Sequence, residues 1–148
     1  MPNQFKLLEG IDRDKTKKAV KAALEKYRFY LLTIPEDKLP KITASYSLVP
    51  PANTNTFHSS TEEAAVRNID CELERDRYIN WLIRGVNRLN EMERKIIYKR
   101  YLNEDEMYDY EIYNELGMSE RKYYRIKARV YYKLAFLLRI EVYTKSMR

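Results

Sequence analysis

The segment SERKYYRIKAR, residues 119–129, gathers the side chains of this sequence that are best suited to recognise a polyanion. Arginine can donate two hydrogen bonds to the edge of a guanine base, whereas lysine, tyrosine and serine can contact phosphate groups. The candidate contact residues are Ser119, Arg121, Lys122, Tyr124, Arg125 and Arg129. Their types indicate recognition of double-stranded DNA in the major groove rather than catalysis.

Two short helices separated by a turn are expected to position this segment. Residues 109–116 have the pattern of a short helix, and Gly117 follows at the point where that helix would end. Glycine accepts the left-handed backbone of a tight turn. Met118 can fill the corner, and the hydroxyl of Ser119 can cap the next helix. We therefore predict a helix-turn-helix unit at about residues 109–134.

The second helix of this unit has two different faces. Its inward stripe, at spacings of three and four residues, is Tyr123, Ile126, Val130, Leu134 and Leu137. Its outward face is Arg121, Arg125, Ala128 and Tyr132, flanked by Tyr124 and Arg129. Tyr113 stands where such units usually have a small residue, so we expect an atypical angle between the two helices. A plain helical hairpin with a solvated basic face is the alternative.

The first 60 residues are expected to form a basic helix and an extended arm. The helix should run from about Asp14 to Thr33, with Asp12 or Asp14 as its cap and Pro35 beyond its end. Its apolar side, at helical spacing, is Val20, Leu24, Tyr27 and Leu31, and its exposed side carries Lys17, Lys18, Lys21 and Lys26. Residues 34–60 hold four of the five prolines. Their alternating stretch at 41–49 is strand-like but has no evident partner strand, so we interpret it as an arm or linker.

Residues 61–148 are expected to form a helical domain. Ser60 to Glu63 has the spacing of a capping box, which predicts a helix containing Ile69 and Leu73. A further helical segment, at about 78–89, can be continuous with it, because no glycine or proline intervenes before Gly85. The apolar side of the next helix is Met92, Ile96, Ile97, Tyr101 and Leu102. The acidic residues 103–106 should form a loop. The predicted fold is an all-α bundle of five to six helices.

The charge distribution supports a polyanion-binding face. The net charge is +6 for the chain, but residues 61–118 carry −5 and residues 119–148 carry +7. Cys71 is the single cysteine, so an intramolecular disulfide and a cysteine-rich metal site are excluded. No glycine loop, nucleophile set or metal cluster is present, and we expect neither an enzyme nor a cofactor. We expect no signal peptide and no membrane span, and hence a cytoplasmic protein.

The stretches LNEMERKIIYKRYL and EIYNELGMSERKYYRIKARVYYKLAFLL resemble the C-terminal DNA-binding domain of bacterial sigma factors. They are more closely similar to the ArpU-type regulators of phage late-gene transcription, most of all at SERKYYRIK (residues 119–127) and LAFLL (residues 134–138). The arm and the lysine-rich first helix also agree with that family. The resemblance implies a sequence-specific DNA-binding activator of virion, packaging and lysis genes that contacts RNA polymerase. It implies DNA contacts at Ser119, Arg121, Lys122, Tyr124 and Arg125.

Two other functions remain open at this stage. A DNA-packaging recognition subunit of the small-terminase type would also carry a helix-turn-helix, but it would assemble into a ring. A protein-binding adaptor would use the acidic middle of the chain and the exposed tyrosines without DNA. The apolar sides of residues 18–32 and 62–86 hint at self-association, and we expect a homodimer.

Overall fold

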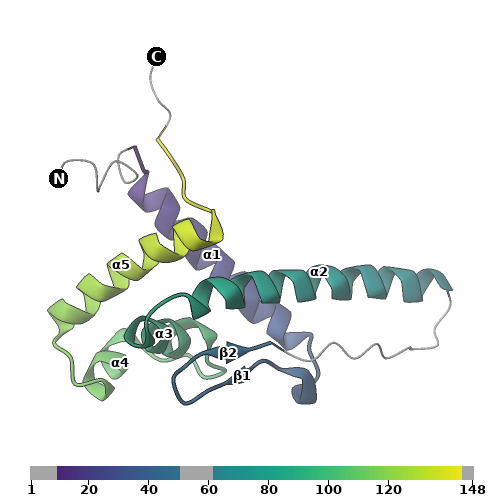
Figure 1. Cartoon of the computed structure of the whole chain (residues 1–148), viewed down its shortest axis with the longest axis horizontal. Helices are drawn as coiled ribbons and strands as arrows, with labels where there is room; N and C mark the ends of the chain where they lie inside the picture. Colours follow the sequence, from purple (N-terminus) through teal and green to yellow (C-terminus); the bar gives the residue numbers. More distant parts are fainter. Residues whose placement is uncertain (1–9, 51–61, 145–148) are drawn as a thin grey trace.

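Helices make up most of the computed structural model, which describes residues 10–50 and 62–144 (Figure 1). Of residues 62–68 the backbone alone is described. The elements are α1 (Arg13–Leu32), the 3-10 helix η2 (Glu36–Lys38), β1 (Lys41–Ile42), β2 (Leu48–Val49), α2 (Glu62–Asn87), α3 (Glu91–Ile97), the π-helical turn η3 (Tyr98–Leu102), α4 (Asp109–Glu115) and α5 (Glu120–Leu138). The all-α prediction is confirmed: the described residues contain five α-helices and one two-stranded sheet.

The main core lies where α1, α2 and the C-terminal half of α5 meet. Val20, Leu24 and Tyr27 of α1 are buried there as expected for the inward side of that helix, and Leu31 is partly buried against the same core. The α-helix α2 continues through Gly85, because this glycine lies against α5 rather than at a break. A Cβ at Gly85 would stand 2.6 Å from Cδ2 of Leu138, whose side chain is buried. The glycine therefore serves the close packing of two helices.

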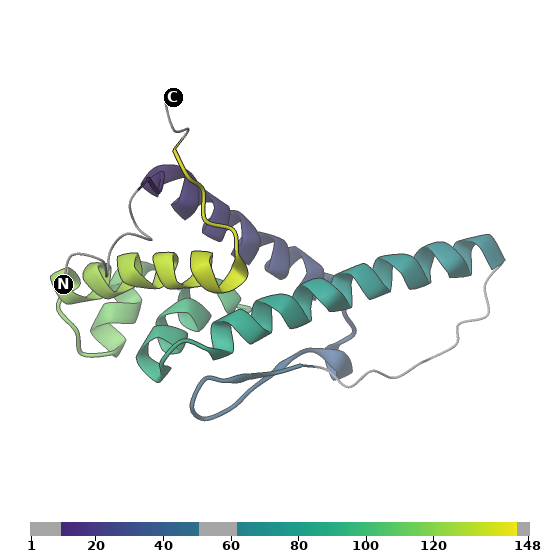
Figure 2. The same cartoon turned by 45° about the horizontal axis from the view of Figure 1, so that its top comes forward.

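The N-terminal half of α2 extends away from the rest of the molecule (Figure 2). The helix begins at Glu62, and the capping hydroxyl expected at Ser60 lies outside the described residues. Ile69 and Leu73 belong to this helix as predicted, but 48% of each residue's surface is exposed. They have no core to enter because the other helices pack against the C-terminal half of α2.

The strand-like stretch of the proline-containing arm, which had no evident partner strand in the sequence, has one in the structure. β1 pairs with β2 in an antiparallel hairpin, with Ile42 opposite Leu48. Tyr46 takes a left-handed φ of 62° in the turn between them. The side-chain amide of Asn87 in α2 receives a hydrogen bond from the Leu48 amide (2.8 Å) and donates one to the Leu48 carbonyl (2.9 Å). This non-local pairing fixes the hairpin on α2, which the local sequence pattern could not reveal.

The inward side of α3 also differs from the expectation at one position. Ile96 and Ile97 are buried, but Met92 is exposed, and Glu93 is buried beside them. The Glu93 carboxylate accepts from the Asn90 amide in a capping box and pairs with the Lys133 ammonium of α5 at 2.8 Å. These two partners offset the cost of burying a carboxylate. In the described part of the chain, none of the helices is both long and apolar enough to cross a membrane.

Candidate nucleic-acid interface

The turn between α4 and α5 has the local geometry that its sequence predicts. Gly117 follows the C-cap residue of α4 and has a φ of +67°. The Met118 amide donates to the Tyr113 carbonyl at 2.8 Å, which closes the turn. The Ser119 hydroxyl accepts from the Lys122 amide at 3.2 Å and caps α5. α5 therefore begins directly after a tight, glycine-dependent turn.

A small apolar cluster lies beneath this turn. Ile96 of α3, Ile112 of α4 and Tyr123 of α5 are fully buried in it. Tyr113, expected to disturb the packing of the two helices, is half-buried there. Its ring centroid lies 5.7 Å from that of Tyr123 in a tilted arrangement. The large side chain thus packs against the edge of the cluster and remains in contact with α5.

Asp109 links the two helices through a second, polar contact. At the start of α4, its carboxylate accepts from the Tyr123 hydroxyl at 2.6 Å and from the Lys127 ammonium at 2.8 Å. Arg100 of η3 lies 3.4 Å from the same oxygen. Partial burial alone would raise the pKa of Asp109, but these donors and charges hold it below its ordinary value. Burial and the bond to this carboxylate raise the pKa of Tyr123.

Lys127 is a site residue that the sequence interpretation missed. Its side chain is 10% exposed and pairs with Asp109. Its ammonium lies 5.7 to 5.9 Å from the ring centroids of four tyrosines, namely Tyr101, Tyr123, Tyr124 and Tyr131. Burial, as the larger effect, lowers the pKa of Lys127. Position 127 lies one helical turn from both Tyr123 and Tyr131, which are buried. The helical period therefore places Lys127 on the inward side of α5, and this spacing could have indicated its burial.

The inward stripe of α5 is centred slightly away from its predicted position. Tyr123, Val130 and Leu134 are buried as expected, whereas Ile126 and Leu137 are only partly buried. The additional buried residues are Lys127, Tyr131, Ala135 and Leu138. The difference arises because α1 packs beside α5 and covers positions that a helical wheel alone leaves undecided.

The residues predicted to contact DNA are brought together on the uncovered surface of α5. The exposed residues are Ser119, Arg121, Lys122, Tyr124, Arg125, Ala128 and Arg129. Arg121, Arg125 and Arg129 follow one another at spacings of four residues, which places them along one side of the helix. None of the four cations in this set forms an ion pair with any residue that the structure describes. Tyr132, which we placed on the outward face, is half-buried.

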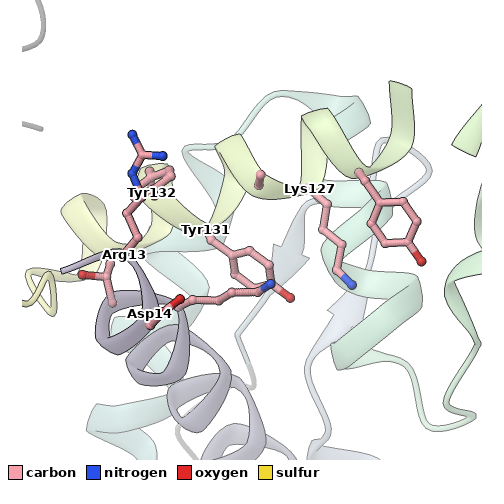
Figure 3. A pocket seen from close by; sticks show the side chains of 9 residues that line it. Arg13, Asp14, Lys127, Tyr131 and Tyr132 are labelled. Atoms are coloured by element: carbon pink, nitrogen blue, oxygen red, sulfur yellow. The ribbon is translucent and has the colours of Figure 1, made fainter. Parts of the chain in front are cut away.

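One edge of this surface borders α1. A cavity of about 230 Å³ lies between the two helices. Its walls are Arg13, Asp14, Thr16 and Lys17 of α1 and Tyr124, Lys127, Ala128, Tyr131 and Tyr132 of α5. In Figure 3, Arg13 and Tyr132 lie at one side of it and Lys127 at the other. The N-terminal half of α1 therefore lies beside the exposed cationic surface of α5.

The fold and this surface define a small helical protein in which α5, directly behind a tight turn, presents four exposed cations that form no ion pair with a described residue. Comparison with known proteins shows its family. The phage-related protein Lin1259/Lin1739 of Listeria innocua is 34% identical over 135 residues, which cover 91% of this chain and 94% of that protein. Protein Gp66 of Listeria phage A118 is 30% identical over 135 residues, covering 91% and 92%. The chain belongs to this family of phage-related proteins. It matches no family model and no solved structure.

Proposed function

We propose that this phage-related protein is a sequence-specific DNA-binding transcriptional regulator. In this proposal α4, the Gly117 turn and α5 act as a helix-turn-helix unit, and the N-terminal half of α5 enters the major groove of double-stranded DNA. The observation that carries it is the group of four exposed cations in the N-terminal half of α5, Arg121, Lys122, Arg125 and Arg129, which form no ion pair with a described residue. Unpaired cations on a helix held by a rigid turn suit a polyanion of regular shape.

The exposed residues of α5 have different roles in this proposal. Arg121 and Arg125, one turn apart, read base edges, because a guanidinium can bond both acceptors of a guanine. Lys122 and Arg129 lie on the side of this pair that faces away from Tyr124, and they neutralise phosphates. The Ser119 hydroxyl and the free backbone amides at the start of α5 donate hydrogen bonds to a phosphate oxygen. Tyr124 contacts the backbone from the edge next to α1.

The resemblance to ArpU-type and sigma-like regulators gives the biological role in this proposal. The protein would activate phage or prophage late genes for virion assembly, packaging and lysis, through a contact with RNA polymerase. It would act without a cofactor and without catalysing a reaction. Its phage-related relatives in Listeria support the phage setting.

The proposal is tested by fluorescence anisotropy on two duplexes: one selected by the wild-type protein from a random library, and a scrambled version of it. Arg121→Ala and Arg125→Ala should each weaken binding to the selected duplex by about 1 to 3 kcal/mol. Binding to the scrambled duplex should fall much less. The melting temperature should stay unchanged, because both side chains are exposed.

Lys122→Ala is the matched variant for a phosphate contact. It should weaken binding to both duplexes alike and lower the salt dependence by about one counterion. Arg84→Ala, an exposed arginine on α2, is the control for loss of charge elsewhere. If both α5 arginine variants bind the selected duplex as tightly as wild type, α5 is not the reading helix.

A DNA-packaging recognition subunit is a second candidate, favoured by one observation. The extended half of α2 exposes Ile69 and Leu73, and a surface of this kind can serve assembly. Light scattering after size-exclusion chromatography separates the two proposals. The regulator is expected to be a homodimer, whereas a packaging subunit would form a ring of many copies. A protein-binding adaptor would bind no duplex even at low salt.

A further inference from the structure

The N-terminal half of α1 is fixed against α5 by the segment that follows α5. The Asp12 amide donates to the Val142 carbonyl at 2.8 Å, and the Thr144 amide donates to the Gly10 carbonyl at 2.6 Å. The Thr16 hydroxyl is buried and bonds both the carbonyl and the amide of Val142, at 3.2 and 3.0 Å. These bonds hold the beginning of α1 in a defined position beside α5.

This half of α1 carries cations without acidic partners. Arg13, Lys15, Lys17, Lys18 and Lys21 are exposed, and none forms an ion pair with a described residue. Among the other described cations, Lys95, Lys99 and Lys133 are paired with carboxylates, whereas exposed residues such as Lys26 and Lys41 form no ion pair with a described residue either. The cations of α1 are distinguished by their position, because they are grouped on the half of the helix that lies beside the exposed surface of α5.

Lys17 and Lys21 occupy the edge of α1 that faces α5. Their ammonium groups lie 5.5 and 6.0 Å from the ring centroid of Tyr131, which is buried in the wall of the cavity. Lysine stems can cover such a ring while the charged ends stay in water. Asp14 is the one carboxylate among the residues that line the cavity, and Arg13 and Lys17 outnumber it there.

We propose that Arg13, Lys17 and Lys21 form a second DNA-contact site, which binds the phosphate backbone beside the groove that α5 enters. The inference rests on the proposed function of α5. A helix in the major groove lies between two phosphate strands about 12 Å apart. A second helix packed on the first has its axis about 8 to 10 Å away. The cations on the near edge of α1 are therefore at the right distance to meet one flanking strand.

The geometry also explains why α1 should contribute affinity rather than sequence preference. Lys17 and Lys21, which lie over the Tyr131 ring, reach outward as point charges and lack the planar fork with which an arginine reads a base pair. Arg13 has such a fork, but in this proposal it contacts the same flanking phosphate strand and no base edge. Phosphates are the same at every position of a duplex. α1 thus fixes the protein on the duplex, while α5 selects the sequence.

The test uses the full chain with Lys17→Gln and Lys21→Gln combined. Glutamine keeps part of the stem over Tyr131 and removes both charges. A plot of log affinity against log salt concentration has a negative slope, and the magnitude of this slope should decrease by about two on both the selected and the scrambled duplex. Affinity should drop equally on both duplexes, so that their ratio is unchanged. Restoring charge with Lys17→Arg and Lys21→Arg should restore the slope.

The matched control combines Lys26→Gln with Lys41→Gln. Lys26 is on the same helix, with its ammonium 4.8 Å from the Tyr78 ring centroid and away from the cavity. Lys41 is exposed on β1. This variant loses the same net charge and should keep the wild-type slope. An equal change of slope in both variants would reduce the effect to net charge and overturn the proposed site.

Failure of this inference can be told apart from failure of the proposed function. If the Lys17 and Lys21 variant keeps the wild-type slope while the α5 arginine variants lose discrimination, the α1 site is wrong and the reading helix stands. If the wild-type protein binds neither duplex at low salt, both proposals fall. Thermal melting by circular dichroism confirms in each case that the variant is folded.

Discussion

The two apolar clusters of this protein differ sharply in size and in how they hold α5. The C-terminal half of α5 enters the main core with α1 and α2, where seventeen of the described residues are buried. Its N-terminal half lies on a cluster of three buried residues, together with the polar contacts of Asp109. Ile126 is partly buried between the two. Damage to the main core should therefore unfold the protein, whereas damage at the turn should first loosen the surface proposed to read DNA.

The largest effect is expected from Leu134→Asp in the main core. Leu134 is fully buried, and the change removes its apolar contacts and buries an unpaired carboxylate. The free energy of unfolding should fall by about 4 kcal/mol or more. Thermal and urea unfolding followed by circular dichroism measure the loss.

Ile126→Asp gives the comparison within the same helix. This side chain is only partly buried, so the added carboxylate can reach water and the loss should be smaller. Equal losses at the two positions would contradict the division of α5 into a strongly and a weakly packed half.

An intermediate effect is expected from Asp109→Ala. The Lys127 side chain is 10% exposed, and this change leaves its ammonium without its counter-charge and the Tyr123 hydroxyl without its acceptor. The expected cost is about 2 to 3 kcal/mol, below that of a fully buried pair because the Asp109 side chain is 21% exposed. Asp105→Ala, in the exposed acidic loop, is the control.

The pH dependence sharpens this prediction. The pKa of Asp109 is lower in the folded protein than in the unfolded chain, where an aspartate titrates near about 3.9. Its contribution is therefore complete above that value and is lost as the pH falls through the folded pKa. The difference in stability between wild type and Asp109→Ala should shrink as the pH is lowered below the pKa of an aspartate in the unfolded chain. A difference that grows in acid would mean that the carboxylate is not held in its charged form.

The contrast between the clusters also shows which features of the molecule the sequence could predict. The Ser119 cap and the Gly117 turn obey rules that act over a few residues, so both were predictable. So were the inward positions of α1. The Asp109–Lys127 pair joins residues eighteen positions apart, and the hairpin is fixed by Asn87, thirty-nine positions from Leu48. Neither partner choice is visible in a local pattern.

The role of Gly85 also depends on a residue far away in the sequence and could not be predicted from the local pattern. A glycine within a helical pattern indicates either a break or a close approach, and only the position of Leu138 decides between them. The exposure of the predicted DNA-contact residues on α5 was predictable, because the helical period alone places them on one side of the helix. The position of α1 beside that set depends on bonds from Gly10, Asp12 and Thr16 to the segment after α5.

The smallest loss of stability is expected from Gly117→Val. A Cβ at this position would meet no atom within 4 Å, so the cost comes from the backbone alone. A φ of +67° is unfavourable for a β-branched residue, at about 1 to 2 kcal/mol. Gly117→Asn should lose less, because asparagine tolerates this conformation. Since the small cluster is weakly held, amide exchange in α4 should quicken and binding to the selected duplex should weaken in the valine variant, while the main core melts only slightly earlier. Wild-type exchange and binding in that variant would show that the angle between α4 and α5 does not depend on this turn.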